Sequence, residues 1–465
     1  MSKYASVIVG IVFCVFGPHL IGEETDVASN WHHFRGPTTN GISQTAKPPT
    51  SWSSSENVAW KIEMPGKGSS SPIIWGEKLF LTAAVSVGDA PAPARMNRDE
   101  LREKFDKNKD GQLDDTERQE AMKFIRAERQ KSLREQKLVV MCFDRNTGEK
   151  IWEDVAIQRK PLEGTHRDGS YASASPFTDG EHVYFNFGSM GLYCYDLAGK
   201  QIWKRTDLGE MQMRGSFGEG SSVAVEDGLL ILPWDHEGQS KIEAINKETG
   251  ETVWKKDRDE PSAWSTPKIV SINGKKQIIH SGENYCRGYD LKTGEELWKA
   301  SGLSTRPVAS PVAKGNVGFF ASSRQGSVLN AFALDGTGDI SSNALWKIDR
   351  QTPDCPSLLL SDNRIFYISA NQGIVSCANS DDGSLFFGAE RLSGMNGCYS
   401  SPVAADGKVF VTGRGGKTFV LADDEEFKLI SHNDIGEGVD ATLALAGDQI
   451  FIRGSKHLFC IQEKK

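Results

Sequence analysis

The sequence predicts an all-β fold, an eight-bladed β-propeller, from a tandem repeat, the number of first strands and one interval that departs from the period. A phrase of the form D-x-x-T-G-x-x-x-W, with small variations, ends each strand-rich unit. The units end at Trp152, Trp203, Trp254, Trp298, Trp346, Phe386 and about Leu429. These anchors lie 40 to 51 residues apart, and such a period with four short strands per unit is typical of propeller blades.

Each unit also carries its own turn and packing residues. The Thr-Gly pair predicts a tight turn between the last two strands, where glycine tolerates a positive φ. We expect the tryptophan to pack between adjacent blades. Eight first strands follow from the segments SSPII, ASASP, SSVAV, STPKI, ASPVA, PSLLL, SSPVA and ATLAL.

The ring is predicted to close through a strand from the N-terminal side. The last unit has no tryptophan-bearing strand, whereas the segment NVAWKI around Trp60 is such a strand without a preceding blade. We therefore expect residues near 58 to complete the eighth sheet, which would remove open strand edges. The predicted propeller spans residues 58–465, and residues 23–57 form an N-terminal leader.

The interval from Trp60 to Trp152 is 92 residues long and breaks the period. Residues 86–137 are predicted to be a helical insertion in the first blade, and the interval without them returns to about 40 residues. The insertion falls between the second and third strands of the blade. We expect it to overhang the mouth of the central channel.

The insertion contains the segment DKNKDGQLDDTE, which matches every position of the EF-hand loop pattern. Helices are expected over residues 98–105 and 116–137. Gly111 allows the sharp turn, Gln112 offers its backbone carbonyl, Asp114 acts directly or through water, and Glu117 is bidentate. The predicted calcium ligands are Asp106, Asn108, Asp110, Gln112, Asp114 and Glu117. The alternative is an acidic surface turn that binds nothing.

The first 22 residues are predicted to be a signal peptide. Lys3 precedes the apolar run VIVGIVFCVFG, which is too short to span a bilayer. An uncleaved membrane anchor is the alternative, and no later segment is apolar enough to span a membrane. We therefore expect a periplasmic or secreted protein. The 62 acidic against 54 basic residues argue against nucleic-acid binding.

Five cysteines sit in similar apolar strand contexts and are predicted to be core thiols. They are Cys142, Cys194, Cys286, Cys377 and Cys460. Cys355 and Cys398 instead open the first strands of neighbouring repeats. A disulfide between them and two free thiols both remain open, because sequence alone cannot assign connectivity.

The repeat resembles the tryptophan-docking repeat of the PQQ-like propeller family. That family includes dehydrogenases that depend on pyrroloquinoline quinone (PQQ) and non-enzymatic propellers such as the outer-membrane assembly lipoprotein of Gram-negative bacteria. The leader WHHFRGPTTNG is similar to the start of many exported bacterial members. The resemblance implies an eight-bladed propeller; it does not imply one activity, because function depends on sites and not on the scaffold.

Within that family, the quinone is sandwiched between a tryptophan and a pair of adjacent cysteines, and this sequence has no adjacent cysteines. We therefore expect a non-catalytic binding or scaffold module, monomeric, with calcium in the EF-hand and a protein partner at the channel rim. The alternatives are a PQQ-dependent oxidoreductase with a divergent site and a hydrolase or lyase that uses rim carboxylates.

Polar residues are expected to gather at the rim. They are His166, Arg167, Arg214, Glu219, Asp235, His236, Glu237, Trp264, Arg306, Asp354 and Asn396. The triplet at 235–237 could supply a general base or a metal ligand, since a histidine stands between carboxylates. A solvated turn is the alternative.

Overall fold

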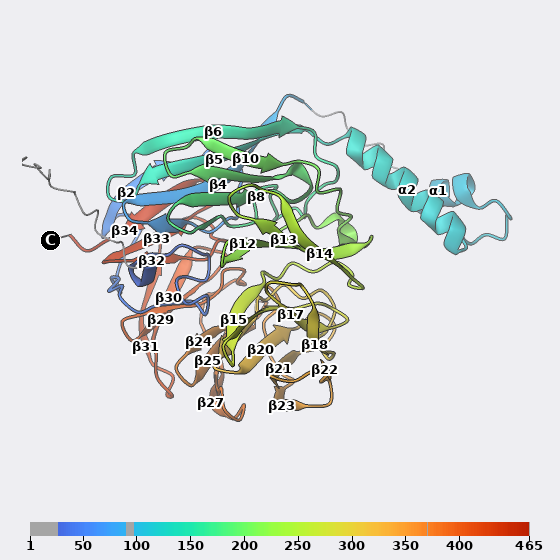
Figure 1. Cartoon of the computed structure of the whole chain (residues 1–465). Helices are drawn as coiled ribbons and strands as arrows, with labels where there is room; N and C mark the ends of the chain where they lie inside the picture. Colours follow the sequence, from blue (N-terminus) through green and yellow to red (C-terminus); the bar gives the residue numbers. More distant parts are fainter. Residues whose placement is uncertain (1–26, 90–96, 370, 465) are drawn as a thin grey trace, which may run out of the picture.

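The computed structural model describes residues 27–89, 97–369 and 371–464, whose strands form eight sheets (Figure 1). The predicted signal peptide lies outside these residues. In seven sheets the four antiparallel strands come from one continuous stretch of the chain. The eighth sheet joins β2 (Val58–Glu63) to β34 (His457–Ile461), with Trp60 opposite Cys460. The predicted eight-bladed propeller closed by an N-terminal strand is confirmed.

Every blade has four antiparallel strands, and two blades carry one further short parallel strand. Blade 1 comprises β3 (Ile73–Trp75), β4 (Lys78–Val87), β5 (Glu135–Asp144) and β6 (Lys150–Arg159). Blade 2 comprises β7 (Phe177–Thr178), β8 (His182–Asn186), β9 (Leu192–Asp196) and β10 (Gln201–Arg205). Blades 3 and 4 comprise β11 (Ala224–Glu226), β12 (Leu229–Trp234), β13 (Ser240–Asn246), β14 (Thr252–Arg258), and β15 (Lys268–Ile272), β16 (Lys275–His280), β17 (Cys286–Asp290), β18 (Glu296–Ala300), β22 (Gly338–Asp339).

Blades 5 and 6 comprise β19 (Val312–Lys314), β20 (Val317–Ser322), β21 (Val328–Ala333), β23 (Ala344–Ile348), and β24 (Leu359–Ser361), β25 (Arg364–Ser369), β26 (Ile374–Asn379), β27 (Leu385–Arg391). Blade 7 comprises β1 (Ile42–Ser43), β28 (Val403–Ala405), β29 (Lys408–Thr412), β30 (Lys417–Ala422) and β31 (Leu429–Asp434). Blade 8 comprises β32 (Ala444–Ala446), β33 (Gln449–Arg453), β34 and β2. The helices are α1 (Arg98–Phe105) and α2 (Asp115–Lys131), with 3-10 turns at Val27–Ser29, Gly188–Met190 and Arg214–Ser216.

The repeated tryptophans dock on the glycine-containing turns of the next blade, as the repeat predicted. Trp203 donates from Nε1 to the carbonyl of Lys247 at 2.8 Å, and its ring lies flat under Gly250. Gly250 has a φ of +75°, and a Cβ there would lie 2.8 Å from the ring. The glycine is therefore required twice, for the turn and for the close approach of the ring.

Blade 4 departs from this pattern. Trp298 is fully buried and donates to Gln277 of its own blade, 3.1 Å away. The following blade has a longer connection in place of the short turn, and β22 from that connection pairs with β18. In blade 6 the residue opposite Cys377 is Phe387, not the expected Phe386, because a bulge shifts the register.

A closed ring of hydrogen bonds links the eight first strands. In each blade one backbone N–H donates to a serine or threonine hydroxyl of the next blade, over 2.9 to 3.1 Å, and the eighth blade donates to the first. The acceptors are Ser71, Ser175, Ser222, Thr266, Ser310, Ser357, Ser401 and Thr442. We call them the hydroxyl ring.

The leader crosses one end of the channel. Its backbone or side chains bond to blades 1, 2 and 4 to 8, from the Trp31–Ile74 pair in blade 1 to the Lys47–Gly447 bond in blade 8. Arg35 is 1% exposed and donates to the carbonyls of Leu358 and Pro402. The leader therefore closes this end and ties the blades together.

The insertion is a helical pair that joins β4 to β5, as predicted. α1 matches the expected residues 98–105, but α2 ends at Lys131, because residues 135–137 extend the sheet by pairing with residues 85–87. Figure 1 shows the pair projecting outward from the propeller body. None of its described residues lines the channel cavity, and the overhang of the channel mouth stays a prediction.

All seven cysteines among the described residues are free thiols. The five predicted core thiols are fully buried, which confirms that prediction. Cys398 is also buried and donates to the carbonyls of Ser400 and Thr412, each 3.1 Å from its sulfur. Cys355 lies beside the channel and is not bonded to it.

Candidate functional site

The central channel holds a cavity of about 410 Å³ that is lined by residues from all eight blades. All eight members of the hydroxyl ring line it, and Phe34 of the leader lies against it. Aromatic and charged residues surround the rest of the cavity: His166, Asp168, Phe217, Trp264, Arg306, Arg324, Asp354, Tyr399 and Asp440. Its volume and mixed lining suit a ligand or a protruding segment of a partner.

Arg414 ties three blades together beside this cavity. Its guanidinium donates to both carboxylate oxygens of Asp440, at 2.7 and 3.2 Å, and to Asp168 at 3.1 Å. It also lies over the ring of Tyr399, 4.0 Å from the centroid. The bonds to Asp440 raise the pKa of Arg414 although burial opposes its charge. This part of the wall is therefore preorganised.

A second arginine occupies the other side. Arg306 has a φ of +61° and its backbone N–H donates to Glu283 at 2.9 Å. The guanidinium lies 5.0 Å from the ring of Phe217 and 3.6 Å from Asp354. Trp264 packs on Phe217, and its indole N–H is bound to the carbonyl of Gly218. Trp264 also lines the cavity.

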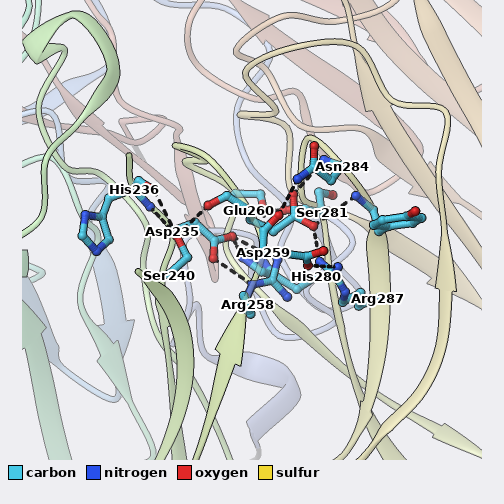
Figure 2. A network of polar contacts seen from close by, with 12 residues as sticks. Asp235, His236, Ser240, Arg258, Asp259, Glu260, His280, Ser281, Asn284 and Arg287 are labelled. Carbon is cyan, nitrogen blue, oxygen red and sulfur yellow. Dashed lines mark hydrogen bonds and ion pairs between the residues drawn. The ribbon is translucent and has the colours of Figure 1, made fainter. Parts of the chain in front are cut away.

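Asp235 and His236 of the predicted triplet at 235–237 belong to a buried network (Figure 2), whereas Glu237 is exposed. Asp235 accepts two bonds from Arg258, at 2.7 and 3.0 Å, and lies 3.2 Å from Nε2 of His280. Burial opposes its ionisation, but Arg258 and His280 hold the pKa of Asp235 at about 2. Nδ1 of His236 accepts two backbone N–H groups. The triplet stabilises the junction of blades 3 and 4.

Sequence reasoning missed the partners of this network. Oγ of Ser265 lies 3.1 Å from Nδ1 of His280, so serine, histidine and aspartate stand in a row. All three are buried, and Arg258 already holds the aspartate. No described cavity includes them. Their burial and mutual contacts order this part of the core.

Glu219, expected at the rim, lies in a separate small cavity of about 40 Å³ with Glu163. It accepts bonds from the backbone N–H and the hydroxyl of Ser189, at 2.6 and 2.7 Å. Burial raises the pKa of Glu219 to about 7. Arg126 of α2 reaches Glu163 at 3.4 Å, so the insertion contacts this part of the propeller. Of the other expected residues, His166, Trp264, Arg306 and Asp354 line the channel cavity.

The insertion has the helix–loop–helix form that the pattern predicted. Asn97 caps α1 in a reciprocal arrangement with Glu100, and Phe105 packs on Phe124 across the two helices. In the loop Gly111 has a φ of +83°, and its N–H donates to Oδ2 of Asp106 at 2.8 Å. The geometry of the turn therefore follows from the glycine.

The first and last carboxylates of the loop, Asp106 and Glu117, are turned inward. Glu117 is 4% exposed and accepts N–H groups of Lys107 and Asp114, at 2.7 and 3.0 Å. Oδ1 of Asp106 is buried and has no partner among the described atoms. A buried carboxylate oxygen without a donor is costly unless a cation approaches it. The residues therefore fit a hard cation that prefers oxygen ligands.

The fold and the channel define this chain as a tryptophan-docking propeller with a preformed axial cavity. A family model described as outer membrane protein assembly factor BamB matches residues 136–389, more than half of the chain. The protein belongs to that family. Neither helix in the described part of the chain has the length and hydropathy needed to cross a bilayer.

Individual relatives are more distant. The crystal structure of BamB from Moraxella catarrhalis superposes with a TM-score of 0.50 at 14% identity, covering 70% of this chain and 89% of that one. The computationally designed Ika8 protein gives 0.50 at 12% identity, covering 71% and 93%. Subunit 1 of methanol dehydrogenase [cytochrome c] from Methylorubrum extorquens is 37% identical over 90 residues, which are 18% of this chain and 13% of that subunit.

Proposed function

We propose that this protein is an exported calcium-binding propeller that acts as a non-catalytic binding module, with a protein partner seated at the open mouth of its channel. The observation that carries the proposal is the mouth itself. Asp168 and Asp440 are fixed by Arg414, and Arg306 faces Asp354. Rigid aromatic and arginine side chains around a preformed hollow are typical of the centres of protein interfaces.

The fold family supports the same direction. The matching family takes its description from an outer membrane protein assembly factor, a name that implies interaction with other proteins. The leader closes the opposite end of the channel, so a partner would enter at the mouth. Periplasmic or secreted localisation is part of this proposal.

Calcium is proposed for the EF-hand loop. Side-chain oxygens of Asp106, Asn108 and Asp110 and the carboxylate of Glu117 would hold it, with the Gln112 carbonyl and Asp114 completing the set. The ion would neutralise the acidic loop and stiffen the helical pair. A lone EF-hand should bind at about 10⁻⁵ to 10⁻³ M, which favours a structural ion.

A PQQ-dependent oxidoreductase is the second candidate, favoured by the 90-residue match to a methanol dehydrogenase and by Trp264 in the cavity wall. The residues present do not fit a calcium-bound quinone. Of the three carboxylates that line the cavity, Asp168 and Asp440 are bonded to Arg414 and Asp354 faces Arg306. Cys355 lines the cavity without a neighbouring cysteine to stack on the quinone.

Two measurements test the proposal. Purified mature protein titrated with PQQ, with and without calcium, should show neither stoichiometric uptake nor dye-linked oxidation of alcohols; uptake with turnover would replace the binding module by an enzyme. A photo-crosslinking side chain at Arg324, at the cavity, should trap a discrete partner in cells. The same side chain at Lys204, exposed on the outer strand β10, is the control.

A further inference from the structure

The hydroxyl ring is an array of donors whose hydrogens the protein does not use. Each of its eight oxygens accepts a backbone N–H from the preceding blade. Within residues 27–89, 97–369 and 371–464 none of the eight hydroxyls donates to another protein atom. All eight line the cavity. They can therefore donate to a ligand that carries hydrogen-bond acceptors.

Two buried cations lie near the channel beneath the ring. Of the residues two positions beyond the ring members, seven are apolar and belong to the buried hydrophobic cores: Ile73, Phe177, Ala224, Val312, Leu359, Val403 and Ala444. The eighth is Lys268, which is 7% exposed. At about 3.3 Å per residue it lies roughly 7 Å along the strand from Thr266.

Lys268 is held by the leader and by no carboxylate. Its Nζ donates to the carbonyl of Thr38 at 3.0 Å and to the hydroxyl of Thr39. Arg35 bonds only to carbonyls, and its Nε has no partner. Among the described residues neither cation forms an ion pair. Both charges therefore act on the channel without an acidic neighbour to cancel them.

The charged residues in the upper part of the cavity do not outweigh the positive charge of Lys268 and Arg35. Arg414 balances part of the charge of Asp168 and Asp440, and Arg306 faces Asp354. Arg324 also lines the cavity, is exposed, and has no ion pair in the described part of the chain. With the buried cations, the charge around the channel is not negative.

We propose that this channel is an anion-binding site that takes a carboxylate or another oxyanion against the hydroxyl ring. The inference deepens the proposed function and rests on it for the source of the anion, a carboxylate of the protein partner. A chain end lowered into the channel would meet hydroxyl donors, with Lys268 and Arg35 below and Arg324 above. Charge-assisted hydrogen bonds of this kind are the stronger ones.

Calorimetric titration of the mature protein tests the site. The probes are N-acetyl-penta-alanine with a free carboxylate, the same peptide as its carboxamide, and sodium sulfate. The carboxylate peptide should bind at least about tenfold more tightly than the carboxamide, and less tightly as salt rises. Equal binding of the two peptides, or binding of no probe, would overturn the anion site. A partner crosslinked at Arg324 would in that case still support the proposed function. Binding of sulfate alone would keep the anion site and overturn the protein source of its ligand.

Variants locate the site. Lys268→Met removes a buried charge and keeps a long side chain, and Arg324→Gln removes an exposed charge. Each substitution should weaken binding of the carboxylate peptide about tenfold. Lys204→Met removes a charge from the outer strand and should change nothing. If Lys268→Met does not fold, Arg324→Gln tests the anion site alone. An unchanged affinity of Arg324→Gln for the carboxylate peptide would contradict the proposal.

Proton uptake gives a second readout. Burial and the neighbouring Arg35 lower the pKa of Lys268 to about 7, and an anion beside it would raise that pKa. Binding at pH 8 should therefore take up close to one proton, measured by calorimetry in buffers of different ionisation enthalpy. Lys268→Met should abolish the uptake; uptake that persists in this variant would place the anion elsewhere.

Discussion

The docking of tryptophan on glycine can be isolated by two substitutions in one blade. Gly250 and Gly228 both lie in turns of blade 3, with φ of +75° and +77°. A Cβ at Gly250 would lie 2.8 Å from the ring of Trp203, whereas nothing lies within 4 Å of a Cβ at Gly228. Gly250→Ala and Gly228→Ala therefore share the backbone strain and differ in the ring contact.

The expected magnitudes follow from these contacts. An alanine in the left-handed region costs about 1 to 2 kcal/mol, partly offset by the lower entropy of its unfolded chain. Gly250→Ala must also displace Trp203, whose indole is bound to Lys247. Forcing a group into such a packed contact costs a further 1 to 3 kcal/mol, roughly. The difference between the two variants should thus be about 2 kcal/mol.

Denaturant titration followed by circular dichroism measures both variants against the parent protein. The midpoint for Gly250→Ala should fall well below that for Gly228→Ala at an unchanged slope. If the two midpoints agreed within error, the contact with Trp203 would contribute nothing, and glycine in the repeat would serve the turn alone. Reversibility must be shown first, since a large repeat protein can unfold in stages.

Other predictions address the insertion, a buried acid and the thiols. Asp106→Ala combined with Glu117→Ala should abolish one calcium site in calorimetry and leave the unfolding midpoint of the propeller unchanged; global unfolding would show that the insertion is not merely appended. Because burial raises the pKa of Glu219 to about 7 from 4.5, the folded state binds its proton more tightly than the unfolded chain. The free energy of unfolding should fall by about 3 kcal/mol from pH 4.5 to 7 relative to Glu219→Gln; parallel pH profiles would contradict this. Thiol titration of denatured mature protein should count both Cys355 and Cys398 as free, giving seven, whereas five would indicate a bridge between them.

Much of the fold was predictable because the determinants repeat locally. The turn glycine and the tryptophan stand at fixed offsets within each unit, so the number of blades, the closing strand at Trp60 and the place of the insertion all follow from spacing. The exceptions occur where the local phrase changes. Trp298 turns inward because the next blade lacks the short turn on which it would dock.

The channel was less accessible to this reasoning. Hydroxyl residues at the starts of the first strands are visible in the sequence, but each bonds to a residue more than 40 positions away, and only the closed ring aligns them. Asp235 was predicted from its neighbours in the chain, whereas its environment comes from Arg258 and His280 on other strands. The direction of the insertion likewise depends on the extension of β4 and β5 beyond the blade.

The closing strand has a consequence for the order in which the protein assembles. β2 is synthesised before any blade, and its partner β34 is among the last strands to be made. The pairing of Val58 with Ile461 can therefore form only when almost the whole chain has been synthesised. Until then the edges of β2 have no sheet to join. Contacts between such distant parts of a chain form slowly, and unpaired edges in the meantime invite aggregation. A protein of this design depends on protection of β2 while the rest of the chain is synthesised.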